Sequence, residues 1–109
     1  MEYDLLRYQG DLKPPIRLTL FDGGSVVSLP PGTTVDFTMT ARDAEGGTPV
    51  ISDTGSVVGD GSAGQVEYAP GVGGWPAAGL YSAWFTVDDG TGAESWPANG
   101  YLTVLILAT

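Results

Sequence analysis

The residues that could carry out chemistry in this sequence are carboxylates, because its 109 residues include no histidine and no cysteine. That inventory excludes histidine-dependent triads, thiol nucleophiles, disulfides and zinc sites built on His or Cys. Thirteen Asp and Glu residues and one lysine, Lys13, remain. Two acids facing each other across a cleft would give a glycosidase, and a loop rich in carboxylate oxygens would bind calcium.

The acids lie in segments that have the composition of turns. A small sandwich seldom has walls for a sugar cleft, and an acid in a turn is ordinarily solvated. The 88–94 loop offers several oxygens to calcium, but its spacing differs from that of an EF-hand, and an Asp-Gly hairpin explains it without a metal. We therefore predict no catalytic residue, no cofactor and no metal, although the candidate pairs for a glycosidase would be Asp88 with Asp89, Asp43 with Glu45, and Asp53 or Asp60.

Tryptophans are the other residues that suggest a function. Trp75 and Trp96 each precede a proline in or beside an expected loop. With Tyr101 they could stack on sugar rings, which would make the protein a carbohydrate-binding module. The alternative for these two tryptophans is that they cap the open ends of the fold. Trp84 is expected to point away from the buried face of its strand, where an indole favours a protein interface.

The elements that must position these residues are strands. Only residues 33–45 and 80–89 run for ten or more positions without Gly or Pro, and both alternate apolar and polar residues with the period of a strand. Asp-Gly and Gly-Gly turns at residues 22–24, 59–62 and 88–92 predict hairpins. Further short strands are expected, each bounded by Gly, Pro or Asp, at residues 5–8, 16–21, 25–29, 50–52, 56–58, 65–68 and 93–96.

This spacing predicts an all-β fold, an immunoglobulin-like antiparallel β-sandwich of about 7–9 short strands in one domain over residues 1–109. Tyr81, two residues before a buried position at the start of a late strand, occupies the place of a tyrosine corner. Ala83 takes the place of the second cysteine of antibody domains, and Phe37 could fill the space of their core tryptophan. The sandwich is expected to hold without a disulfide.

The last strand carries apolar residues on both faces. Leu102, Val104 and Ile106 alternate with Leu105 and Leu107. One face belongs in the core, and the other needs a second cover, such as a neighbouring protein. If the strand at residues 80–87 lies beside it, Trp84 joins the same patch. We therefore expect Trp84, Leu105 and Leu107 to form an interface.

Charge and targeting signals narrow the partners. The formal net charge is −9, with four Lys and Arg residues. Neither nucleic acid nor an anionic membrane is an expected partner, because both attract basic surfaces. The start of the chain lacks the basic and apolar regions of a signal peptide, and no apolar run is long enough to span a bilayer. A soluble protein is expected.

Several segments occur in an order that is typical of one family. The last part follows a pattern of a Gly-x-Tyr strand, an acidic Gly turn, an aromatic-Pro pair and a final strand. In this order the sequence resembles the immunoglobulin-like N-terminal domain of phage upper baseplate proteins, a family of tailed-phage tail and baseplate components. The segments that carry the resemblance are residues 9–11, 16–20, 34–39, 64–68, 79–85, 94–97 and 101–104.

The resemblance implies a non-enzymatic module that docks onto other virion proteins in many symmetry-related copies. We accordingly expect a bacteriophage virion structural protein of the tail, baseplate or head-to-tail region, assembled in the host bacterial cytoplasm. Two alternatives stay open. One is a carbohydrate-binding accessory domain that contacts host surface glycan through Trp75, Trp96 and Tyr101. The other is a head decoration protein.

Overall fold

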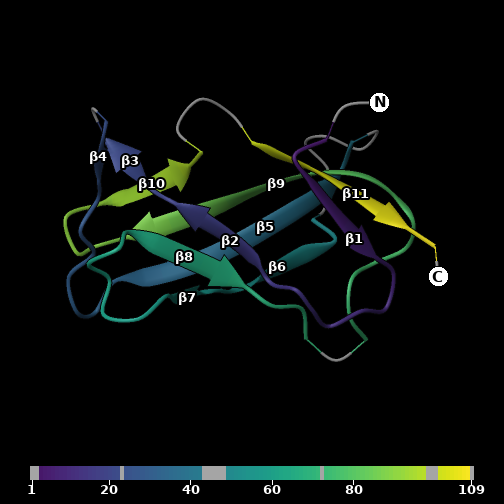
Figure 1. Ribbon diagram of the computed structural model, residues 1–109, viewed down its shortest axis with the longest axis horizontal. Helices are drawn as coiled ribbons and strands as arrows, with labels where there is room; N and C mark the ends of the chain where they lie inside the picture. The colour runs from purple at the N-terminus through teal and green to yellow at the C-terminus, as the bar shows by residue number, and fades with distance from the viewer. Residues whose placement is uncertain (1–2, 23, 43–48, 72, 98–100, 109) are drawn as a thin grey trace.

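Within the described residues the alternating segments form strands arranged as a six-stranded sheet, a three-stranded sheet and a separate two-stranded sheet. The computed structural model describes residues 3–22, 24–42, 49–71, 73–97 and 101–108 (Figure 1). Within these ranges no helix has the length and hydropathy needed to cross a bilayer. The strands are β1 (Leu5–Tyr8), β2 (Ile16–Thr19), β3 (Phe21–Asp22), β4 (Ser25–Val26), β5 (Thr34–Ala41), β6 (Ile51–Thr54), β7 (Ser56–Val57), β8 (Gln65–Tyr68), β9 (Gly79–Asp88), β10 (Ala93–Trp96) and β11 (Leu102–Leu107).

The strand order is that of an immunoglobulin-like sandwich. The larger sheet has the order β1-β11-β9-β5-β6, with β10 also paired to β9, and the smaller sheet has the order β2-β8-β7. These orders match the G-F-C and B-E-D arrangements of immunoglobulin domains. All pairs are antiparallel except β1 with β11, which run parallel. The predicted all-β sandwich is therefore confirmed, with one parallel pair at its edge.

The structure divides one predicted strand into two. Residues 16–21 were expected to be continuous, but β2 ends at Thr19 and β3 begins at Phe21. Between them Leu20 is buried, its N–H donates to the carbonyl of Gly64 at 2.7 Å, and its carbonyl accepts from Val27 at 2.9 Å. The chain thereby leaves the smaller sheet and enters the β3–β4 hairpin. Asp22 pairs with Ser25 in this hairpin. The turn predicted at residues 22–24 includes Gly23, which lies outside the described residues.

Aromatic rings from both sheets form the centre of the core. Phe37 of β5 and Phe85 of β9 are fully buried, with ring centroids 5.1 Å apart. Phe37 also stacks on Tyr68 of β8 at 4.5 Å, which joins the larger sheet to the smaller one. Ala83 is fully buried on the same face of β9. Phe37 thus occupies the centre of the sandwich, as predicted.

Tyr81 forms the expected tyrosine corner. Its hydroxyl donates to the carbonyl of Ala77, four residues upstream, at 2.6 Å, and its ring is buried. In immunoglobulin-like domains a tyrosine at this position closes the turn before the strand in this way. The contact holds the segment that leads into β9 against the core.

Candidate docking surface

The outer face of the larger sheet carries a row of leucines. Residues that pair across neighbouring strands point to the same side of a sheet. Leu6 pairs with Leu105, and Leu105 pairs with Leu80, so three leucines from β1, β11 and β9 lie side by side. Tyr8 pairs with Leu107 in the adjoining row. We call these five residues the leucine patch.

The leucine patch remains accessible because the other sheet covers only the inner face. Val104 and Ile106, which alternate with the patch residues along β11, are buried in the core. Tyr8 is 44% exposed and Leu107 is 37% exposed, whereas the three remaining leucines are half-buried. Single exposed apolar residues are ordinary, but a contiguous apolar group on one sheet face is typical of an association site.

An arginine lies beside the patch. Ala41 pairs with Tyr81, which places Arg42 next to Leu80 on the same face. The Arg42 guanidinium donates to Oγ1 of Thr103 at 3.1 Å and lies 4.7 Å from the ring centroid of Tyr101. This cation–π contact holds the side chain across β11. The apolar patch therefore has a positive charge on its border, although the protein as a whole is strongly acidic.

Trp84 lies on the expected face but outside the leucine patch. Its neighbours in β9, Ala83 and Phe85, are fully buried, and Trp84 itself is half-buried. The strand at 80–87 does lie beside the last strand, as predicted. However, Leu105 pairs with Leu80, which is four residues, or about 13 Å, from Trp84 along the strand. The prediction of one shared patch is corrected by this register, which places Trp84 beyond Arg42.

The three residues expected to stack on glycan do not form one platform. Trp75 is only 1% exposed and packs edge-on against Tyr68, with ring centroids 6.0 Å apart. Trp96 pairs with Phe85 and so faces the inner side of the sheet. Tyr101 follows the outer-face positions of β11 and has the Arg42 guanidinium over its ring. A ring must be exposed to stack on a sugar, so the glycan prediction is corrected at Trp75, which is buried in the core.

Asp60 and Asp89, two of the candidate acids, act as turn formers. Asp53 instead lies in β6, where its Oδ2 accepts from the Tyr68 hydroxyl at 3.3 Å, so the expectation of a turn is corrected there. Oδ1 of Asp89 accepts from the backbone N–H of Thr91 at 3.0 Å and from its hydroxyl at 2.6 Å, and Asp60 makes the same two bonds to Ser62. These bonds lower the pKa of both carboxyl groups. Among the described residues no three acids lie close enough to hold a metal ion, and Asp43 and Glu45 fall outside those residues.

Sequence reasoning missed part of the surface. Leu6, Tyr8 and Leu80 join Leu105 and Leu107 because β1 and β9 flank β11. The signal available was the apolar pair at residues 5 and 6, which, like the last strand, presents apolar side chains to both faces. This signal could have been interpreted only with the knowledge that the first and last strands of the sequence pair in parallel.

Comparison with models of known protein families, with curated proteins and with solved structures finds no match for this chain.

Proposed function

We propose that this protein is a non-enzymatic structural component of a bacteriophage particle, and that it docks onto another virion protein through the outer face of its larger sheet. The observation that carries the proposal is the leucine patch, an apolar surface that continues across β1, β11 and β9. The order of motifs resembles that of the phage baseplate domain. This resemblance supports a role in the virion and favours a position in the tail, baseplate or head-to-tail region.

The partner is a different protein rather than a second copy of this chain. Two copies would bring net charges of −9 together, and repulsion of this kind keeps free copies dispersed. A partner with a complementary surface would be attracted by the same charge. Burying one leucine side chain completely contributes about 1.5–3 kcal/mol, so covering the exposed parts of the patch would supply several kcal/mol to docking.

The first test is the composition of particles. Gradient-purified particles from an infected or induced culture of the source are analysed by quantitative mass spectrometry, with the major capsid protein as the reference. A fixed stoichiometry is the expected result. A low copy number would favour the tail or baseplate, and a copy number close to that of the capsid protein would favour head decoration. Absence from particles would refute the virion role.

The second test addresses the surface. Leu107→Glu places a charge in the leucine patch at an exposed position, and it is expected to reduce incorporation at least about tenfold by removing the apolar contact. Thr54→Glu is the matched control, because Thr54 is an exposed position on the same face of the same sheet, in β6. Equal incorporation of the two variants would contradict the docking surface, and thermal unfolding confirms that both are folded.

Trp84 is tested separately, since it lies apart from the patch. If the interface extends past Arg42, Trp84→Ala also reduces incorporation. Unchanged incorporation would limit the contact to the leucine patch and remove Trp84 from it.

A further inference from the structure

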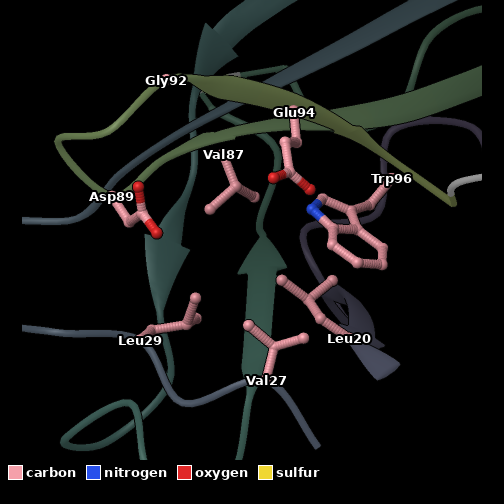
Figure 2. A pocket seen from close by; sticks show the side chains of 8 residues that line it. All are labelled: Leu20, Val27, Leu29, Val87, Asp89, Gly92, Glu94 and Trp96. Carbon is pink, nitrogen blue, oxygen red and sulfur yellow. The ribbon is translucent and has the colours of Figure 1, made fainter. Parts of the chain in front are cut away.

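A small pocket opens at the end of the sandwich opposite the leucine patch. It lies between the β3–β4 segment and the β9–β10 hairpin. Leu20, Val27 and Leu29 line one side of it, and the hairpin that carries Trp96 lines the other (Figure 2). Figure 1 shows β3, β4 and β10 gathered at this end, away from β1 and the end of β11.

The two loop segments are held in place by backbone bonds. The N–H of Leu29 donates to the carbonyl of Gly61 at 3.0 Å, and the N–H of Leu20 donates to the carbonyl of Gly64. Gly61 has a φ of 88°, and a Cβ there would overlap the carbonyl of Leu29. The β7–β8 loop therefore supports the apolar side of the pocket closely, so the pocket is built into the fold.

The charged groups at the pocket are both acidic. Figure 2 shows the carboxylates of Asp89 and Glu94 on the side opposite Leu29 and Val27, with Glu94 facing the indole of Trp96. None of the described lining residues is basic. The chain's own arginines are engaged elsewhere, for example Arg17 with Glu67 at 2.8 Å. The pocket thus combines an apolar side, an indole and two negative charges.

The size of the pocket restricts what can enter. Its volume is about 40 Å³, whereas sites for small-molecule ligands usually enclose about 300–1,000 Å³. On the same measure a cavity of about 10–15 Å³ holds one water molecule, so the pocket has room for a group the size of an ammonium ion. A planar guanidinium is larger. One compact cationic group on an apolar stem fits these limits.

We propose that this pocket binds the end of a lysine side chain presented by a partner protein. The methylene stem would lie against Leu20, Val27 and Leu29, as lysine stems commonly lie on apolar surface. The ammonium group would be placed near Asp89 and Glu94 and beside the indole of Trp96, where charge attraction and a cation–π contact act together.

The position of the pocket agrees with a binding role. The β3–β4 segment connects β2 to β5, and the β10 segment connects β9 to β11. These connections correspond to the B–C and F–G loops, which carry antigen contacts in immunoglobulin variable domains. The inference does not rest on the leucine patch or on the virion role, since the pocket and the patch lie at different places on the sandwich.

The test uses Nα-acetyl-lysine methylamide as the probe, Nα-acetyl-norleucine methylamide as its uncharged counterpart and Nα-acetyl-arginine methylamide as a cation with a larger head group. Each is titrated into the ¹⁵N-labelled full chain at low ionic strength, and chemical shifts are followed. The lysine derivative is expected to shift the indole N–H of Trp96 and the amides of Leu20 and Val27, with a Kd on the order of 1–10 mM. The norleucine and arginine derivatives are expected to bind at least about threefold more weakly.

Variants separate a specific site from general attraction. Glu94→Gln is expected to weaken lysine binding by roughly threefold. In the double variant with Asp89→Asn, the preference for lysine over norleucine should vanish, while the asparagine oxygen can still accept from Thr91. Asp36→Asn removes the same charge from the outer face of β5 and is expected to change nothing.

Four results would overturn the proposal. The first is the absence of shifts at the pocket with the lysine derivative, and the second is equal binding of the lysine and norleucine derivatives. The third is an effect of Asp36→Asn as large as that of Glu94→Gln, because it would show that the net charge of the protein, and not the pocket, attracts the lysine derivative. Tighter binding of the arginine derivative would refute the assignment to lysine.

Discussion

The tyrosine corner gives a quantitative test of the fold. Tyr81→Phe removes the hydroxyl that donates to Ala77 at 2.6 Å and leaves the buried ring in place. A neutral hydrogen bond contributes about 0.5–1.5 kcal/mol net. Because Ala77 is exposed, water can solvate its carbonyl after the substitution, so the larger cost of an unsatisfied buried acceptor does not apply. We expect the free energy of unfolding to fall by about 1 kcal/mol.

The same loss in the free energy of unfolding can be expressed as a fall in Tm. A chain of 109 residues unfolds with an entropy of about 0.23 kcal/mol/K, so 1 kcal/mol lowers Tm by about 4 °C. Urea unfolding followed by tryptophan fluorescence, and calorimetry, measure the two quantities. Tyr8→Phe is the control, because Tyr8 is 44% exposed, and it should change stability by less than about 0.5 kcal/mol. Equal losses in Tyr81→Phe and Tyr8→Phe would refute the reasoning.

Three further substitutions test the packing and the ionisation of the core. Gly61→Ala should cost about 1–3 kcal/mol more than Gly32→Ala in urea unfolding, because both glycines have a φ near 90° but only Gly61 would place a Cβ against Leu29. Ser82→Ala should raise Tm, because the buried hydroxyl of Ser82 has no hydrogen-bond partner among the described residues; an unchanged or lower Tm would indicate a partner. Burial raises the pKa of Tyr68, so the unfolded chain loses that proton at lower pH than the folded chain does. Stability should therefore decline as the pH rises above 10.0, the usual tyrosine value, and decline less in Tyr68→Phe; identical alkaline slopes would contradict this cause.

Most of the strands followed from local patterns. The bounds of β1, β8 and β10 agree with the predicted segments, and the alternation in β5 and β9 placed Phe37 and Phe85 in the core. Period-two alternation predicts which residues are buried because one face of each strand is removed from water. The hairpin turns were predicted for a related reason, since Gly and Asp tolerate the backbone conformations that tight turns need.

The candidate site was predicted less completely. Leu105 and Leu107 were identified, because a strand that is apolar on both faces cannot bury both in one small core. Their neighbours Leu6 and Leu80 were not identified, since pairing between distant segments leaves no local signal. The choice between a glycan contact and a packing role for Trp75 stayed open for a similar reason: a loop residue before a proline gives no periodicity, and its burial depends on the space beside Tyr68.

The amino-acid sequence by itself determined the strand content, the turn positions, the inner face of each long strand and the absence of His and Cys chemistry, because these depend on residue type and short spacing. Only the tertiary structure decided which strands are neighbours. That choice joined β1 to β11 in parallel, separated Trp84 from the leucine patch, and brought Leu20, Glu94 and Trp96 around one pocket. Strand pairing and loop packing are set by the cooperative filling of a shared core, so they follow from the whole chain and from no single segment of it.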